Sequence, residues 1–287
     1  MGTDNNTNDD DYDISTWVGT DTDDNRYESV RSMWLSQGVT SSSNGDWYQR
    51  GAQHYEDHCP PTLDGVLGGF AEMTQDDLQG SLDFVRYLQQ SLGKLGGSPA
   101  SEDGQTILKD AIACECGAGI GRVSKGLLLQ PLGFGRCDLV ESSPHLLASA
   151  PEYLGDAAAS KCRYYCNGLQ EWGPPQPNMY HLIWIQWVFC YLTDNDAIAF
   201  LKRCRKGLVQ EGGLIILKEN ACPLDSTDDF VLDLEDASVT RSIRYLKYLA
   251  QEAGLRVVHL LETQSNFPED NFPVPMIALE PATDSKK

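Results

Sequence analysis

Three glycines at alternate positions constrain the fold of this chain more than any other feature. Gly117, Gly119 and Gly121 follow the short apolar run 111–115, and the run from 122 onward has the pattern of a helix. Glycine suits a turn from strand to helix because it tolerates a positive φ and lets the backbone approach a ligand closely. The pattern therefore predicts a buried strand, a tight loop and a helix, and it indicates a cradle for a nucleotide.

An acidic residue beyond the loop sharpens this prediction. The run 137–141 is a second predicted strand, and Glu141 follows Gly121 by twenty residues. A carboxylate at this distance can accept both hydroxyls of a ribose. The loop contains no Gly-Lys-Ser/Thr, which argues against a P-loop for nucleoside triphosphates. NAD and S-adenosylmethionine both fit these features, so the rest of the chain has to decide between them.

Predicted strands and helices alternate through the middle of the chain. We expect further strands at 162–166, 181–186 and 214–218, with helices at 144–153 and after the capping sequence 193–196. Alternation at this pitch is typical of a parallel, doubly wound α/β sheet with right-handed crossovers.

The end of the chain departs from this pattern. A predicted helix at 239–253 is followed by strands at 255–261 and 274–279, and the loop between these strands is too short for a crossover helix. The two strands should therefore pair antiparallel. A doubly wound sheet that ends in an antiparallel hairpin looks like the class I methyltransferase fold, which is Rossmann-like, rather than a dehydrogenase.

The composition divides the chain into three parts. Residues 1–45 are rich in Asp, Asn, Ser and Thr without a sustained hydrophobic period, so we predict an acidic, disordered tail. Residues 46–105 are predicted to form an N-terminal helical extension and a substrate lid, with a capping box of Thr74 and Asp77. Residues 106–287 form the predicted cofactor-binding core.

Charge and cysteine content restrict the class of partner and the compartment. The net charge of −20 argues against nucleic acid and favours a cationic substrate such as a basic peptide. The nine cysteines are odd in number and lack the Cys-x-x-Cys spacing of a zinc site, so we expect reduced thiols and no metal. No signal peptide is recognisable, and the most apolar run, 182–192, is too short to span a bilayer. We therefore expect a soluble, monomeric protein of the cytoplasm or nucleus, without a membrane partner.

Several motifs then point to one family. They are Asp64-Gly-Val-Leu-Gly-Gly, Glu115-Cys-Gly-Ala-Gly-Ile-Gly-Arg, Ile183-Trp-Ile-Gln-Trp, Leu192-Thr-Asp, Lys218-Glu-Asn and Asp236-Ala-Ser-Val-Thr-Arg. With these motifs in order over 46–280, the chain resembles the eukaryotic protein α-N-terminal methyltransferases. That family methylates N-termini that begin X-Pro-Lys or X-Pro-Arg after removal of the initiator Met. The resemblance implies S-adenosylmethionine as the cofactor, S-adenosylhomocysteine as its product, and protein substrates with basic N-termini.

The resemblance also implies which residues bind the cofactor. They are Gly117, Gly119, Arg122, Glu141, Ser143, Leu169, Gln170 and Gln186. Arg122 would meet the methionine carboxylate, a partner that suits a guanidinium fork. Glu141 would bind the ribose, where the family often has Asp. Leu169 and Gln170 would border the adenine, and Gln186 would lie near the methionine amine.

A second set of residues would form the acceptor site. The expected catalytic residues are Asp236, Tyr191 and Asn220, and the expected substrate-binding residues are Leu67, Trp187, Asp233 and Ser238. An α-amine has a pKa of about 8, so it must lose a proton before it can attack a methyl group. Asp236 is expected to accept or relay that proton, and Asn220 to bond the substrate N-terminus. Asp233 and Ser238 would hold the Lys or Arg side chain, Trp187 would lie over the ammonium, and Leu67 would belong to the lid.

Two departures from the family concern the acceptor site. Tyr191 stands where the family has a His that suits proton acceptance, and a tyrosine with a pKa of about 10 is a poor base at neutral pH. Asp236 would then carry more of the proton transfer. Glu56 follows Tyr55 where the family has Trp, which replaces an aromatic wall by a carboxylate that attracts a cationic peptide.

Three alternatives stay open from the sequence. The acceptor of an S-adenosylmethionine-dependent enzyme can be a small amine or a lysine side chain instead of an α-amine. The protein can also be a non-catalytic binder of basic N-termini, with Tyr191 as the sign of lost chemistry. A NAD-dependent oxidoreductase fits least, because no His/Lys arrangement for hydride transfer is visible and the terminal hairpin argues against it.

Overall fold

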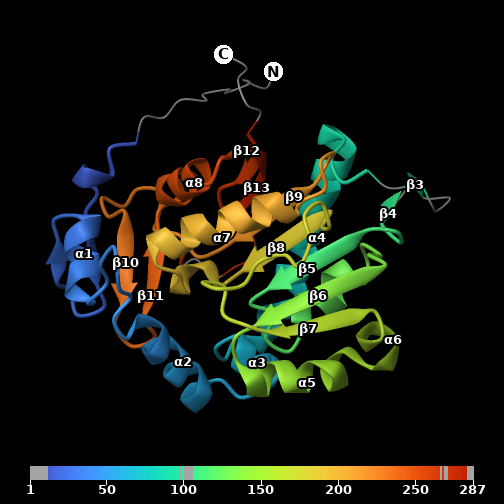
Figure 1. The fold of residues 1–287 in the computed structure, drawn as a ribbon, viewed down its shortest axis with the longest axis horizontal. Coiled ribbons are helices and arrows are strands. Elements are labelled where there is room, and N and C mark those ends of the chain that lie inside the picture. The colour runs from blue at the N-terminus through green and yellow to red at the C-terminus, as the bar shows by residue number, and fades with distance from the viewer. Residues whose placement is uncertain (1–11, 97, 100–105, 266, 268–270, 283–287) are drawn as a thin grey trace.

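A seven-stranded sheet forms the centre of the protein, in the order β12-β13-β9-β8-β5-β6-β7 (Figure 1). The computed structural model describes residues 12–96, 98–99, 106–265, 267 and 271–282. The strands of the sheet are β5 (Ile112–Cys116), β6 (Arg136–Glu141), β7 (Cys162–Cys166), β8 (Leu182–Gln186), β9 (Leu214–Lys218), β12 (Leu255–Leu261) and β13 (Met276–Pro281). Strands β5 to β9 pair in parallel, whereas β13 pairs antiparallel with both β9 and β12. The predicted fold, a doubly wound sheet with a C-terminal antiparallel hairpin, is confirmed.

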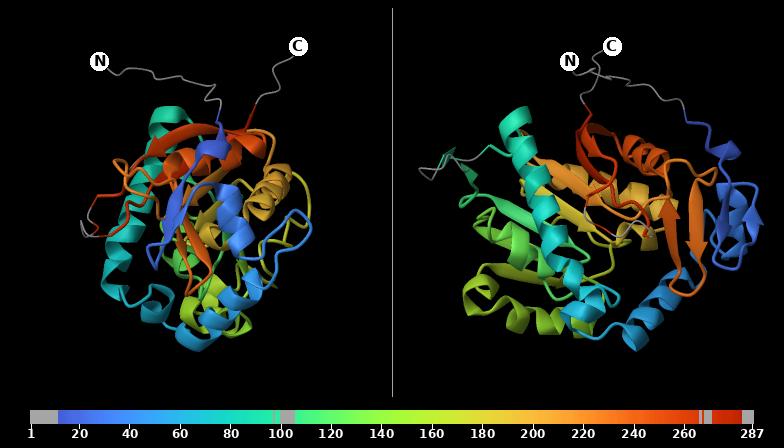
Figure 2. Two further views of the ribbon diagram at one scale, coloured as in Figure 1. Left: turned by 90° about the vertical axis from the view of Figure 1, so that its left-hand side faces the viewer. Right: turned by 180° about the vertical axis from the view of Figure 1, so that it is seen from behind.

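Helices cover both faces of this sheet. They are α4 (Thr74–Leu92), α5 (Pro144–Leu154), α6 (Asp156–Ala159), α7 (Asp194–Gly207) and α8 (Ile243–Glu252). Helices α7 and α8 pack on one face, and α4 and α5 pack on the other. Figure 1 shows α7 in front of the sheet, and the right-hand view of Figure 2 shows α4 crossing the opposite face. Every residue of β8 and β9 is buried, as expected of parallel strands covered on both sides.

The predicted helix at 239–253 is wrong at its start. Residues Ser238–Arg241 form strand β11, which pairs antiparallel with β10 (Phe230–Asp233), and α8 begins only after the N-cap Ser242. The β-branched side chains of Val239 and Thr240 suit a strand, and pairing with β10 decides between strand and helix. The two strands form a hairpin, called here the acceptor hairpin, whose tip carries Asp236.

The predicted capping box at Thr74 and Asp77 is also wrong. Helix α4 begins at Thr74 after Met73, whose side chain makes no capping hydrogen bond. Within the described residues, the buried Oγ1 of Thr74 has no hydrogen-bond partner. The carboxylate of Asp77 instead binds Arg122 and Lys218. Two cationic partners from the sheet side outweigh a local bond to the helix terminus.

Residues 12–45 are ordered, so the prediction of a disordered tail is wrong for them, whereas residues 1–11 lie outside the described residues. The elements of residues 12–45 are η1 (Ile14–Thr16), β1 (Gly19–Asp21), β2 (Arg26–Tyr27) and α1 (Val30–Ser36). Strand β1 pairs in parallel with β10, which gives a second sheet in the order β11-β10-β1-β2. Trp17, Met33 and Trp34 are buried against the core. The composition of this segment is polar on average, but a few large apolar side chains pack into the core and fix its position.

The remaining elements connect this segment to the sheet. They are α2 (Trp47–His58), α3 (Leu63–Val66), η2 (Ala71–Met73), β3 (Ser98–Pro99), β4 (Thr106–Ile107), the π-helix η3 (Ser124–Leu128) and η4 (Phe189–Tyr191). The predicted helix after the glycine loop is thus a short π-helical segment. Thr193 caps α7 as predicted, because its side chain accepts a hydrogen bond from the Asp196 amide. Of the helices in the described parts of the chain, none is long and apolar enough to cross a membrane.

Trp34→Ala tests whether residues 12–45 are docked in solution. The Trp34 ring packs edge-on against Trp47 with centroids 5.0 Å apart, and its Nε1 donates to Asp194 at 2.8 Å. We expect its loss to lower the free energy of unfolding by about 3 kcal/mol in urea denaturation. The neighbouring Leu35 is 52% exposed, so Leu35→Ala should change that free energy by less than about 0.5 kcal/mol. Equal, small effects of both substitutions would contradict the docked position.

Candidate active site

A cavity of about 540 Å³ lies at the carboxyl ends of β5, β6 and β8. Ligands of open α/β sheets bind at this edge of the strands. The cavity is lined by all eight residues that were predicted to bind the cofactor: Gly117, Gly119, Arg122, Glu141, Ser143, Leu169, Gln170 and Gln186. One sheet edge therefore brings together residues that are spread over seventy positions of the sequence.

The glycine loop needs glycine for steric reasons. Gly117, Gly119 and Gly121 have φ values of +70°, +52° and +85°. A Cβ on Gly117 would lie 2.5 Å from Cβ of Val188, which real structures do not tolerate. The loop can thus lie against the residues that follow β8 only because residue 117 has no side chain.

Glu141 joins the glycine loop to the end of β6. Its Oε2 accepts a hydrogen bond from the Gly119 amide at 2.8 Å, and its Oε1 accepts one from the Ser143 amide at 2.8 Å. Oε1 also accepts the Ser142 hydroxyl at 3.3 Å, whereas Oε2 keeps a second lone pair for a further donor. One ribose hydroxyl would bond Oε2, and a second would compete with the long Ser142 bond at Oε1.

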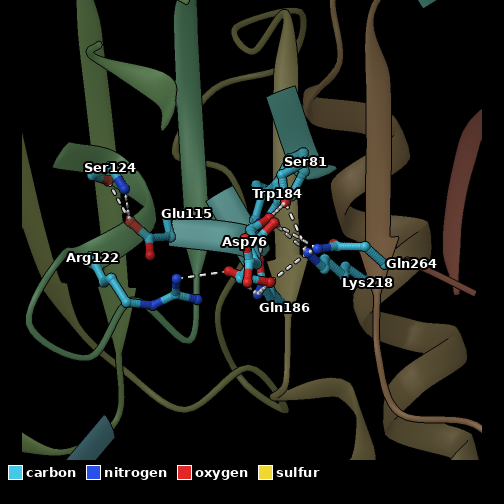
Figure 3. Close-up of polar contacts among 10 residues, drawn as sticks. Asp76, Ser81, Glu115, Arg122, Ser124, Trp184, Gln186, Lys218 and Gln264 are labelled. Atoms are coloured by element: carbon cyan, nitrogen blue, oxygen red, sulfur yellow. Dashed lines mark hydrogen bonds and ion pairs between the residues drawn. The ribbon is translucent and has the colours of Figure 1, made fainter. Parts of the chain in front are cut away.

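Arg122 and Gln186 share one buried partner. Nη1 of Arg122 donates to Oδ2 of Asp77 at 2.7 Å, and Nε2 of Gln186 donates to both Asp77 oxygens at 3.0 and 3.1 Å. Figure 3 shows Arg122 on the left and Lys218 on the right, with Gln186 between them. No other hydrogen bond joins the Arg122 guanidinium to a described residue. Its remaining N–H groups are thus left for a carboxylate in the cavity.

A hydrogen-bonded chain of three side chains lies beside the cavity. Tyr191, which lines the cavity, donates to Oδ2 of Asp236 at 3.1 Å, and its hydroxyl lies 3.1 Å from that of Tyr55. Burial raises the pKa of Asp236, and the charge of Asp233 raises it further. Burial also raises the pKa of Tyr191, so its phenol stays neutral at physiological pH. The arrangement pairs a neutral donor with a carboxylate that is ready to bind a proton.

Of the other predicted acceptor residues, some line the cavity and others lie outside it. Trp187 lines the cavity, and its Nε1 donates to Oδ1 of Asn220 at 3.1 Å. Ser238 pairs with Asp233 across the acceptor hairpin. Five predicted residues are not part of the cavity lining: Leu67, Asn220, Asp233, Asp236 and Ser238. Asn220 and Asp236 reach it through one hydrogen bond each, to Trp187 and Tyr191.

Asp77, Lys218 and Tyr55 were not predicted as site residues. Because its sequence pattern predicts a helix-capping box, Asp77 was not considered for the cavity site. The ionic contact of Lys218 is predictable from the sequence. A lysine at the end of an apolar strand that is buried on both sides needs an ionic partner. Tyr55 reaches Tyr191 across 136 residues of sequence, and no local pattern predicts such a contact.

The family of the chain follows from sequence and structure together. Residues 43–280 match the family model described as AdoMet-dependent proline di-methyltransferase. An N-terminal Xaa-Pro-Lys N-methyltransferase 1 from Danio rerio is 41% identical over 228 residues, which are 79% of this chain and 93% of that protein. The chain belongs to this family. The α-N-terminal protein methyltransferase 1 of Arabidopsis thaliana is 34% identical over 278 residues, which are 93% of this chain and 92% of that protein.

A solved structure of similar sequence has the same architecture. A SAM-dependent methyltransferase from Leishmania major superposes with a TM-score of 0.75 at 33% identity, over 92% of this chain and 96% of that chain. The protein is therefore an S-adenosylmethionine-dependent methyltransferase of the class I fold. A NAD-dependent oxidoreductase is not favoured.

The cavity residues fit this cofactor. The unused donors of Arg122 suit a carboxylate, the spare lone pair on Oε2 of Glu141 suits a ribose hydroxyl, and the bare backbone at Gly117 leaves room beside the strand ends. Individual roles for the eight residues stay predictions.

Gly117→Ala tests the loop as part of the cofactor site. We expect it to weaken binding of S-adenosylhomocysteine, measured by calorimetry, by about tenfold or more, equivalent to roughly 1.4 kcal/mol. The new Cβ must displace either the loop or Val188. Gly93 also has a positive φ, with open space around it and no place in the cavity. Gly93→Ala should lower stability by about 1 kcal/mol but leave ligand binding unchanged, and equal binding losses in both variants would refute the local explanation.

Proposed function

We propose that this protein transfers methyl groups from S-adenosylmethionine to the α-amine of protein N-termini of the X-Pro-Lys/Arg type. The printed names of its relatives, N-terminal Xaa-Pro-Lys N-methyltransferase, support this acceptor. The observation that carries the proposal is the pair of Tyr191 and Asp236 beside the cofactor cavity. S-adenosylmethionine supplies the electrophilic methyl group, and the protein has to supply a deprotonated, aligned amine.

Asp236 is the proton acceptor in this proposal. An α-amine with a pKa of about 8 is largely protonated at neutral pH and has no free lone pair. Asp236 is partly buried, its pKa is raised, and its Oδ2 already receives the Tyr191 hydroxyl. Its Oδ1 is buried without a hydrogen-bond partner among the described residues. The Ser238 side chain nearby lowers the pKa of Asp236, but by less than burial raises it. An ammonium group satisfies Oδ1 and gives up its proton there.

Tyr191 orients this carboxylate and does not act as the base. Its raised pKa keeps the phenol neutral, so it donates a hydrogen bond and stabilises the ionised form of Asp236. Trp47 fixes the Tyr191 backbone, because its Nε1 donates to the Tyr191 carbonyl at 2.7 Å. The family His is thus replaced by a rigid neutral donor.

The rest of the acceptor site fits an extended basic peptide. With Oδ1 of Asn220 held by Trp187, its Nδ2 is free to donate to the first carbonyl of the substrate. Asp233, next to Ser238 in the acceptor hairpin, supplies a carboxylate for the Lys or Arg side chain. Glu56 is exposed at the cavity lining, where it attracts the same cationic segment. Leu67 follows α3 in the proposed lid.

Mass spectrometry of a Ser-Pro-Lys-Arg peptide tests the acceptor. With enzyme and S-adenosylmethionine, we expect methyl gain on the free peptide and none on an N-acetylated copy. Asp236→Asn should lower the rate by about a hundredfold or more, because an amide cannot accept the proton. Methyl gain on both peptides would move the acceptor to a side chain. Cofactor binding without any methyl gain would support a non-catalytic binder instead.

The pH dependence of kcat/KM tests the division of roles between Tyr191 and Asp236. Activity needs ionised Asp236, so the rate should fall as the pH drops through the raised pKa of this group. Tyr191→Phe removes a hydrogen bond that lowers the pKa of Asp236, so this acidic limb should move up by about one pH unit. Tyr55 touches Tyr191 and not Asp236, so Tyr55→Phe should move the limb less. An acidic limb that stays in place in Tyr191→Phe would exclude the proposed role of the phenol.

A further inference from the structure

A buried network fixes the start of α4 to the sheet. Asp77 in the first turn of α4 is 0% exposed, and its carboxylate accepts from Arg122, Gln186 and Lys218. Lys218, at the end of β9, is also 0% exposed and donates to the Asp77 carbonyl at 3.2 Å and to Ser81 Oγ at 2.9 Å. The carboxylate therefore lies between two cations, Lys218 at the end of β9 and Arg122 just after the glycine loop that follows β5.

A loop near the end of the chain closes the network. Lys218 donates to Oε1 of Gln264 at 2.6 Å, and Nε2 of Gln264 donates to the Asp76 carbonyl at 2.7 Å. Figure 3 shows Ser81, Lys218 and Gln264 grouped on the side of the network away from Arg122. Asp77 is thus held in place by contacts that do not involve Arg122, and it forms a rigid support for the guanidinium.

Two cations of the network, Arg122 and Lys218, contact the carboxylate of Asp77. Burial alone would raise the pKa of Asp77, but the charges of Lys218 and Arg122 outweigh it and lower the pKa below its usual value. One carboxylate is therefore shared by two cations. The other buried carboxylate nearby, Glu115, accepts bonds from the amide and hydroxyl of Ser124 instead. The charges of Glu115 and Arg122 interact, but no hydrogen bond joins the side chains of these two described residues, so the free N–H groups of Arg122 are left for a carboxylate in the cavity.

We propose that Asp77 is a positioning residue for the amino-acid part of the cofactor. It holds the Arg122 guanidinium and the Gln186 amide in the orientation in which they meet the carboxylate and amine of the methionine moiety. The inference rests on the proposed function and on the cofactor-binding roles predicted for Arg122 and Gln186. A planar guanidinium bonded through Nη1 has its other N–H groups fixed in direction, so the loss of Asp77 misaligns them.

This role predicts a selective loss of affinity. S-adenosylhomocysteine carries the carboxylate and the amine, whereas 5′-methylthioadenosine keeps the adenosine and the sulfur but lacks the amino-acid part. A positioning role of Asp77 affects only the first ligand. A general distortion of the cavity affects both.

Calorimetry of the two ligands tests the inference in the full chain. Asp77→Asn alone leaves two buried cations without a counter-charge, so we pair it with Lys218→Met, which keeps the net charge of the network unchanged and the volume similar. We expect the Asp77→Asn/Lys218→Met double variant to raise the Kd of S-adenosylhomocysteine about tenfold, the value of one lost charge-assisted hydrogen bond. The Kd of 5′-methylthioadenosine should stay within about twofold. Thermal melting of the ligand-free protein checks the fold.

Two further variants keep the test decisive. Lys218→Met alone retains the bond between Asp77 and Arg122, so it should weaken S-adenosylhomocysteine less than the double variant does. Asp77→Glu keeps the charge but moves the carboxylate by one methylene, and it should reproduce the selective loss even if the double variant fails to fold.

The outcomes separate this inference from the proposed function. Equal weakening of both ligands, or of neither, in the Asp77 variants overturns the positioning role. If Arg122→Gln leaves the affinity for S-adenosylhomocysteine unchanged, the role of Arg122 fails and the inference fails with it. If Arg122→Gln weakens that ligand and the Asp77 variants do not, the inference alone is wrong. If these affinities are as expected but the peptide is not methylated, the proposed acceptor is wrong and the positioning role of Asp77 stands.

Discussion

The parallel strands of the central sheet have to be covered on both faces, and the rest of the structure depends on how the chain meets this requirement. Helix α4 covers one face, and residues 12–45 join α7 and α8 over the other. Helices α4 and α2 reach the strand ends where the cavity lies. Helix α4 carries Asp77 to Arg122, and α2 carries Tyr55 to Tyr191. Covering the core and building the site are thus achieved by the same segments.

Local sequence patterns predicted those parts of the fold that depend on local chemistry. Strands β7, β9 and β12 have the predicted bounds, and the glycine loop lies where its spacing required. All eight predicted cofactor residues line one cavity, because parallel strands end at a common edge. Contacts between distant segments escaped prediction. Val239 and Thr240 form a strand because β10 pairs with them. Asp77 binds two cations that are distant in sequence, Arg122 and Lys218, instead of capping its own helix.

The replacement of the family His by Tyr191 changes how a proton can leave the acceptor site. Two tyrosine hydroxyls and one carboxylate form a chain in which the carboxylate is the group that ionises, because burial raises the pKa of Tyr191 and keeps its phenol neutral. Burial also raises the pKa of Tyr55, so the chain holds neutral donors on one side of Asp236. The rigid backbone of Tyr191, bonded to Trp47, keeps this geometry without a bound peptide.

The parallel pairing of β1 with β10 has a consequence for synthesis on the ribosome. The Val18 amide donates to Asp229 across 211 residues of sequence, and β10 belongs to the acceptor hairpin. Until β10 has emerged, β1 can pair only with the two-residue strand β2, and closing so long a loop is slow. A nascent chain that already contains the cofactor loop thus lacks its acceptor site, and the enzyme matures only when its two ends meet.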